Sequence, residues 1–166
     1  MKVLLLAITL SFAAASTATA QIKWMSWEEA VAANAKAPKK VFVDVYTDWC
    51  GWCKRMDAAT FSDKSVAAVI NENFYAVKLD AEQKEAITFR DKVYEFQASG
   101  RRGAHGLAIE LLQGRMGYPT VVFLDEDLEV IQPVPGFQDK AAMLKVATYF
   151  GTDVYRSTPW NEYTGK

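Results

Sequence analysis

The sequence predicts one small α/β or α+β domain, and three observations lead to this prediction. A length of 166 residues suits a single domain. A hydrophobic share of 51% with 13% aromatic residues can build one packed core and argues against intrinsic disorder. Two β-favouring runs, at 41–46 and 74–79, alternate with segments of helical pattern, as expected for buried strands covered by helices.

The charge balance and the residue counts exclude several function classes. A formal net charge of −1 lacks the basic excess of a nucleic-acid-binding protein, so we expect no nucleic acid partner. One histidine and two cysteines are too few for most metal sites and for a small domain held together by several disulfides. We therefore expect no metal and no separate cofactor.

Residues 1–20 have the pattern of a secretory signal peptide. A lysine precedes the mostly apolar segment 3–15, and small residues lead up to Ala20. We expect cleavage between Ala20 and Gln21, export to the periplasm or the medium, and a single domain over residues 21–166. An uncleaved N-terminal anchor is the alternative.

Capping and hydrophobic patterns predict the order of the elements. Ser26 and Glu29 can form a capping box for a helix that runs to about Ala35. The further expected elements are a strand at 41–46, a helical segment at 54–60, a helix capped by Ser62 or Asp63, a strand at 74–79, a short hairpin at 87–96, a loop at 97–103, a helix from Leu107 to Gly114, a strand at 120–124 that turns at 125–127 into a strand at 128–131, and a helix with an apolar face at 143–150.

The only two cysteines, Cys50 and Cys53, follow the strand at 41–46 and begin the next helical segment. Residues i and i+3 of a first helical turn are close enough for a disulfide. Unpaired backbone N–H groups and the helix dipole favour a thiolate at the first cysteine. We therefore expect Cys50 to be the attacking thiolate near neutral pH and Cys53 to be the resolving thiol.

Three other interpretations of this pair stay open. A purely structural disulfide would close a loop so short that its entropic stabilisation is small. One half of a zinc site would need two more ligands, and with only His105 available they would have to come from carboxylates or a second chain. Inert buried cysteines are the third interpretation.

Several motifs together resemble the thioredoxin superfamily. The segment from Phe42 to Lys54 is similar to the strand and active-site segment of that family. Lys78-Leu79-Asp80 resembles its next central strand, Tyr118-Pro119-Thr120 its cis-proline junction, and Gly136 the glycine of its last strand. The resemblance covers about residues 41–150.

This resemblance implies the thioredoxin fold, in which helices flank a central mixed β-sheet. Here the fold would carry an inserted hairpin and helix region at about 85–115, before the cis-proline strand, and a C-terminal tail at about 152–166. Exported DsbD-like reductases carry comparable elaborations. Docking of the substrate by Ile87–Phe96 is therefore a hypothesis.

The resemblance also implies roles for individual residues. Asp44 matches a buried acid that assists proton transfer at the second cysteine, and Lys78 matches a lysine near that acid. The residues implied in substrate binding are Trp49, Gly51, Trp52, Tyr118 and Pro119.

Simpler interpretations of the same residues remain. Asp44 could be a salt-bridged core acid and Lys78 an exposed charge. Pro119 could follow an ordinary trans bond, and Trp49 could pack against the domain instead of joining Trp52 and Tyr118 in an apolar rim around Cys50.

Other side chains near the motifs receive structural interpretations. We expect His105 at a helix start or on the surface and Arg101-Arg102 in a solvated loop. Met56 and Met116 are expected to pack near the cysteines.

The function indicated is an exported thiol–disulfide oxidoreductase that exchanges disulfides with protein thiols, most simply as a reductase. In an oxidising compartment a reductase needs electrons, which implies a membrane donor of DsbD type. Gly51-Trp52 replaces the Gly-Pro of thioredoxin, so the direction cannot be inferred from the dipeptide. The alternative is a non-catalytic binding module of thioredoxin fold with a structural disulfide.

Overall fold

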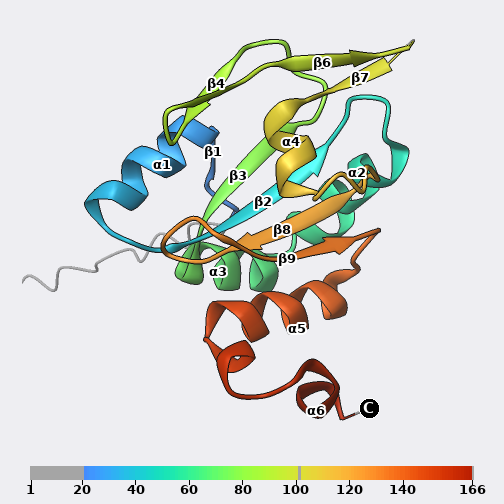
Figure 1. Ribbon diagram of the computed structural model, residues 1–166. Coiled ribbons are helices and arrows are strands. Elements are labelled where there is room, and N and C mark those ends of the chain that lie inside the picture. Colours follow the sequence, from blue (N-terminus) through green and yellow to red (C-terminus); the bar gives the residue numbers. More distant parts are fainter. Residues whose placement is uncertain (1–20, 101, 166) are drawn as a thin grey trace, which may run out of the picture.

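The computed structural model describes residues 21–100 and 102–165 and has a five-stranded mixed sheet at its centre (Figure 1). The strand order is β1-β3-β2-β8-β9. Neighbours β1, β3 and β2 are parallel, whereas β8 is antiparallel to β2 and β9 is antiparallel to β8. The bounds are Trp24–Met25 for β1, Lys40–Tyr46 for β2, Phe74–Asp80 for β3, Thr120–Leu124 for β8 and Val130–Pro135 for β9. The expected mixed sheet is confirmed.

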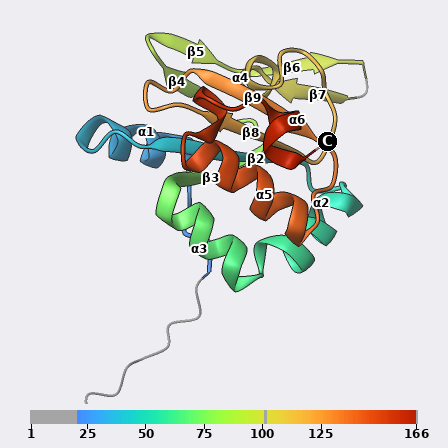
Figure 2. The same ribbon diagram turned by 90° about the horizontal axis from the view of Figure 1, so that it is seen from below.

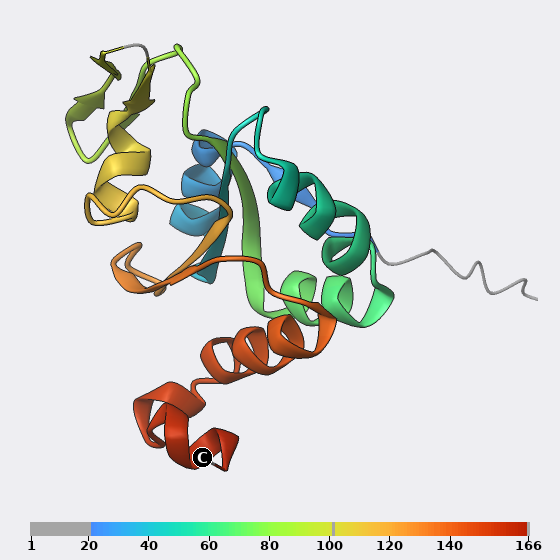
Figure 3. The ribbon, with the colours of Figure 1, turned by 90° about the vertical axis from the view of Figure 1, so that its right-hand side faces the viewer.

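Helices cover both faces of this sheet (Figure 3). One face carries α1 (Trp27–Lys36) and α4 (Gly106–Leu111). The other carries α2 (Gly51–Met56), the π-helical turn η1 (Asp57–Phe61), α3 (Lys64–Asn73) and α5 (Lys140–Gly151). Helices α3 and α5 lie side by side (Figure 2).

The alternation of side chains along β2 explains where the core and the site lie. Val41, Val43 and Val45 point to the face covered by α1 and α4, and Phe42 points to the opposite face. There Phe42 packs on Phe123 with ring centroids 5.4 Å apart. Asp44 has the same parity as Phe42, so the strand directs this carboxyl to the face that carries α2.

Side-chain caps fix the starts of the helices as the sequence predicts. Ser26 and Glu29 form both hydrogen bonds of a capping box at α1. Asp63 caps α3, because its Oδ1 accepts hydrogen bonds from the N–H groups of Ser65 and Val66 at 2.9 and 3.2 Å.

Asp63→Ala is expected to lower the free energy of unfolding, since it leaves these two N–H groups without a side-chain acceptor. It also removes an ion pair with Lys140. Urea unfolding of the variant and the wild type measures the difference. Lys140→Ala removes only the exposed ion pair and should cost less. Equal losses in the two variants would contradict the cap as the main contribution.

The inserted region differs from its prediction in one element. The expected hairpin is present as β4 (Ile87–Phe89) and β5 (Lys92–Tyr94). The loop expected at 97–103 is wrong, because β6 (Phe96–Ser99) and β7 (Arg102–His105) form a second hairpin. Most of β6 is exposed, so its sequence lacks the apolar alternation of a half-buried strand.

The second hairpin is tied to the central sheet at His105. The backbone N–H of His105 donates to the carbonyl of Ala81, just beyond β3, at 2.7 Å. The side chain of His105 caps α4 by accepting from the N–H of Leu107. His105 is fully buried. The expected helix start is confirmed and the surface placement is wrong.

Strand β9 begins later and runs further than the segment 128–131 predicts. The Asp125 carboxylate accepts from the N–H groups of Asp127 and Glu129, which extends the turn and delays the strand. At the other end, the N–H of Gly136 donates to the carbonyl of Pro119 at 2.8 Å. Successive residues of a strand direct their backbone groups to opposite sides. Because Gly136 faces β8, the nitrogens of Pro133 and Pro135 point away from β8, toward the open edge of the sheet.

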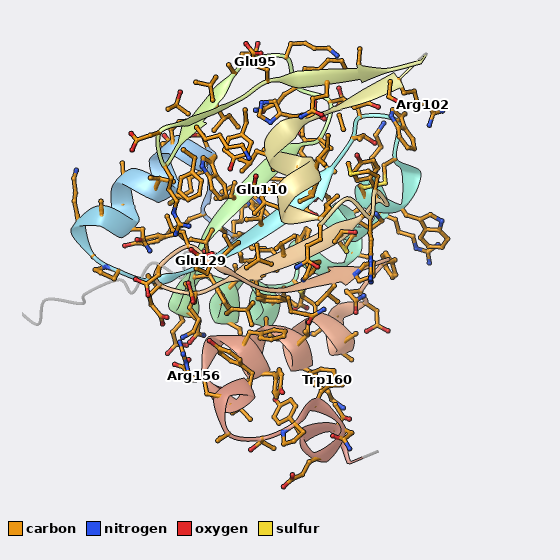
Figure 4. The ribbon with its side chains drawn as sticks, in the orientation of Figure 1. Glu95, Arg102, Glu110, Glu129, Arg156 and Trp160 are labelled. Carbon is orange, nitrogen blue, oxygen red and sulfur yellow. A yellow bond between two sulfur atoms is a disulfide. The ribbon has the colours of Figure 1, made fainter. Side chains whose placement is uncertain are left out.

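The C-terminal tail folds back on α5 as η2 (Val154–Arg156) and α6 (Trp160–Thr164). Tyr149 of α5 contacts the ring of Trp160 with centroids 5.0 Å apart, and Trp160 lies between the two helices (Figure 4). Across residues 21–100 and 102–165, every helix is too short or too polar to cross a bilayer. The predicted signal peptide lies outside the described residues.

Candidate active site

Cys50 and Cys53 form a disulfide at the start of α2. Their Cα atoms are 5.3 Å apart, within the range that a disulfide requires. Cys50 is the residue that caps α2, and its Sγ accepts a hydrogen bond from the backbone N–H of Cys53 at 3.1 Å. Only 4% of Cys50 is exposed and Cys53 is buried below it.

The backbone between β2 and α2 holds the first cysteine in this position. The N–H of Cys50 donates to the carbonyl of Thr47 at 3.1 Å, and the carbonyl of Cys50 accepts from the N–H of Lys54 at 3.2 Å. The chain thus turns directly from the end of the buried strand into the helix. As a result, the sulfur of Cys50 lies among the free N–H groups of the first helical turn.

A buried carboxylate and a lysine lie on the same face of the sheet as α2. Asp44 is 1% exposed, and its Oδ2 is 2.8 Å from Nζ of Lys78 on β3. Lys78 also pairs with Asp57, which follows α2. Oδ1 of Asp44 has no hydrogen-bond partner within the described part of the chain. The structure therefore brings Asp44 and Lys78 together, and Lys78 is not an edge-exposed charge.

Burial decides the ionisation of this pair. Desolvation raises the pKa of Asp44 from 3.8 to about 6, although the charge and hydrogen bond of Lys78 oppose this rise. Desolvation also acts to lower the pKa of Lys78, but the carboxylates of Asp44 and Asp57 outweigh it and raise this pKa above 10.5. Asp44 can therefore gain or lose a proton near neutral pH while Lys78 stays charged.

Aromatic side chains lie on two sides of the disulfide. Trp49 is 53% exposed and packs edge-on against Tyr118, with ring centroids 5.9 Å apart. The Tyr118–Pro119 peptide bond is cis. Trp52 is 56% exposed and contacts Phe137 instead, at 5.5 Å between centroids. The structure thus joins Trp49 and Tyr118, as expected, but gives Trp52 a different partner.

Contacts that the sequence analysis missed hold both tryptophans. The indole N–H of Trp49 donates to Glu82 Oε1 at 3.1 Å, and the guanidinium of Arg102 lies 4.6 Å from the ring centroid of Trp49. Arg55 stacks on Trp52 at 5.3 Å. Arg102 belongs to β7, so the expected solvated loop is wrong for this residue.

The remaining expectations near the cysteines have mixed outcomes. Met56, the last residue of α2, is fully buried, but Met116 is 41% exposed because it lies on the loop before the cis peptide. Gly51 is exposed, and a Cβ there would meet no atom within 4 Å. The sequence analysis did not include Asp57 in the site. Asp57 follows Cys53 by four residues, so helical spacing places the two on the same face, and this spacing could have identified it.

Metal-binding side chains do not gather at this site. Within residues 21–100 and 102–165, no three histidine, cysteine, aspartate or glutamate side chains come close enough to hold an ion.

Comparison with known proteins identifies the family. Residues 6–149 match the family model Thioredox_DsbH, whose description is "Protein of unknown function, DUF255". The chain belongs to the Thioredox_DsbH family. The expected membership of the thioredoxin superfamily, with DsbD-like relatives, is thereby confirmed.

Relatives of this Thioredox_DsbH protein include much longer chains. It is 32% identical over 111 residues to "Uncharacterized protein B0495.5" of Caenorhabditis elegans, covering 66% of this chain and 13% of that one. It is 31% identical over 100 residues to "Thiol:disulfide interchange protein DsbD" of Vibrio vulnificus, covering 59% and 13%. This chain thus spans about an eighth of the length of these curated relatives.

Solved structures share the fold of this Thioredox_DsbH protein. "DsbH Oxidoreductase" superposes with a TM-score of 0.57 at 18% identity and covers 81% of this chain and 87% of its own. At this identity the likeness shows the thioredoxin fold alone.

Proposed function

We propose that this protein is a thiol–disulfide oxidoreductase that exchanges disulfides with protein partners through Cys50 and Cys53. The observation that carries the proposal is the disulfide at the start of α2, with the Cys53 N–H directed at the sulfur of Cys50. A donor in this place stabilises a thiolate on Cys50 more than a thiol, and it thereby lowers the pKa of Cys50 in the reduced protein. The relatives named "Thiol:disulfide interchange protein DsbD" support the same chemistry.

The exchange moves two electrons from the protein to its partner. The Cys50 thiolate attacks one sulfur of the partner disulfide, and the other partner sulfur leaves as a thiolate that takes up a proton. Cys53 then loses its proton and attacks Sγ of Cys50, which releases the second partner thiolate. The protein ends with the Cys50–Cys53 disulfide and the partner with two thiols.

Asp44 is proposed as the proton acceptor for the second step. Its pKa of about 6 leaves most of it ionised at neutral pH, and its free Oδ1 can accept a proton. Lys78 holds the other oxygen and thus positions the carboxylate. Trp49, Trp52, Tyr118 and Pro119, with the open surface at Gly51, are proposed to hold the partner segment around Cys50.

Export and a reductive direction complete the proposal. The signal pattern of residues 1–20 supports export, and an oxidising compartment would keep the disulfide formed unless electrons arrive. A membrane electron donor of DsbD type would supply them. The protein would then reduce exported proteins whose cysteines have been oxidised.

The reduction potential of the Cys50–Cys53 couple tests the direction. Equilibration of the full chain with dithiothreitol mixtures, followed by tryptophan fluorescence, should give a value near the −270 mV or so of thioredoxin. The same protein should then catalyse the reduction of insulin by dithiothreitol. A potential near the −120 mV or so of a strong oxidant would contradict the reductive direction.

A further inference from the structure

A groove lies between the inserted hairpin and the cis-proline loop. Its volume is about 690 Å³, which is in the range of ligand-binding clefts. One wall is the hairpin β6–β7, and the other is the loop Met116–Tyr118. Trp49, which directly precedes Cys50 in the chain, also lines the groove.

Trp49 is held in place from three separate parts of the chain. Tyr118 packs against its ring, Glu82 accepts its indole N–H, and Arg102 covers its face. Arg102 lies at the outer end of the inserted hairpin, above the loop that leads into α2 (Figure 4). The insertion therefore extends the surface around the disulfide.

Arg102 presents a positive charge to the groove that can receive an acidic group. Arg102 is exposed, and within the described part of the chain no carboxylate lies within ion-pairing distance of it. Glu82, the acid in the groove wall, accepts the Trp49 N–H. Lys84 adds a second cation at the adjoining end, where it lies over the ring of Phe96. The carboxylates of Asp80 and Asp48 add negative charge near Glu82, so the positive charge is local to the guanidinium of Arg102.

We infer that this groove holds the polypeptide segment next to the partner's reactive cysteine and that Arg102 selects an acidic side chain in that segment. The inference rests on the proposed function and specifies its substrate class: protein disulfides flanked by aspartate or glutamate. Because the guanidinium is exposed, its effect is expected mainly on the rate of encounter. Arg102 is thus a specificity-determining residue that acts through charge complementarity.

Three synthetic peptides test this inference. Each carries one cysteine as a mixed disulfide with 2-mercaptoethanol, flanked by glutamate, glutamine or lysine. The reduced full chain should reduce the glutamate peptide about threefold faster than the glutamine peptide, which is the size expected of one exposed ion pair. The lysine peptide should react more slowly than the glutamine peptide. Raising the salt from 0.05 to about 1 M should bring the three rates together.

Variants of Arg102 separate the charge effect from other changes. In Arg102→Gln the ratio of glutamate to glutamine rates should fall to about one, and in Arg102→Glu it should invert. The ratio cancels any general loss of activity caused by disturbing Trp49. Lys64→Gln is the matched control, since it removes one exposed cation from α3 on the opposite face of the sheet and should keep the threefold ratio.

The possible outcomes distinguish this inference from the proposed function. Peptides that all react, with ratios that do not change in the Arg102 variants, would overturn the selection by Arg102 and leave the oxidoreductase intact. Peptides that are not reduced at all would overturn the proposed function and this inference with it. If Arg102→Glu does not fold, Arg102→Gln and the salt dependence still decide.

Discussion

Asp44→Asn should change the free energy of unfolding more favourably at pH 8 than at pH 3. The difference between the two changes is expected to be about 3 kcal/mol. The pKa of Asp44 rises from 3.8 to about 6 on folding, mainly because the carboxyl is desolvated. Between pH 3.8 and about pH 6, the carboxyl of Asp44 is more often protonated in the folded state than in the unfolded state. The stability of the wild type therefore falls as the pH rises through this window, by about 1.4 kcal/mol for each pH unit. Asparagine does not ionise and avoids this loss.

Urea unfolding of both proteins at pH 3 and pH 8 measures this effect. The stability of the variant minus that of the wild type should be larger at pH 8. Asp57→Asn is the matched control, because Asp57 contacts the same lysine but its side chain is 45% exposed. If the stability of Asp44→Asn minus that of the wild type is the same at both pH values, burial does not raise the pKa of Asp44.

Cys50→Ser and Cys53→Ser should have different effects on a partner disulfide. Cys50→Ser should reduce insulin no faster than dithiothreitol alone, because no thiolate remains to attack. Cys53→Ser should still attack, but it cannot resolve the product, so it should accumulate a mixed disulfide with the partner. Non-reducing gel electrophoresis and mass spectrometry of the trapped species measure this outcome.

These two variants also test the alternative function. If the wild type and both variants are equally inactive with insulin while a partner protein still binds all three, the protein is a binding module and its disulfide is structural. Trapping by Cys50→Ser but not by Cys53→Ser would contradict the assigned order of attack.

The central sheet could be predicted because its strands are buried on both faces. The runs at 41–46 and 74–79 consist mainly of β-favouring residues, each with a single charged residue, Asp44 or Lys78, and such runs have few alternatives to a buried strand. The cap at Ser26, and a cap at Ser62 or Asp63, could also be predicted, because caps depend only on residues a few positions apart. The hairpin β6–β7 could not be found in this way, since its strands are exposed and are held by contacts such as that of His105 with Ala81.

The site shows the same division between local and distant contacts. Cys50 and Cys53 are neighbours on one helical turn, so their spacing alone predicted the disulfide that the structure contains. The pairing of Trp52 with Phe137 and of Trp49 with Arg102 joins segments that are far apart in the sequence. No periodicity encodes such contacts, because they depend on where the loops lie after folding.

The prolines of β9 have a consequence for the open edge of the sheet. A free strand edge can recruit an extended polypeptide through its unpaired backbone groups, which leads to aggregation. Pro133 and Pro135 point their nitrogens to the outer side of β9 and offer no hydrogen there. An extended polypeptide that approached this edge would therefore lack two hydrogen-bond donors for a continuous ladder.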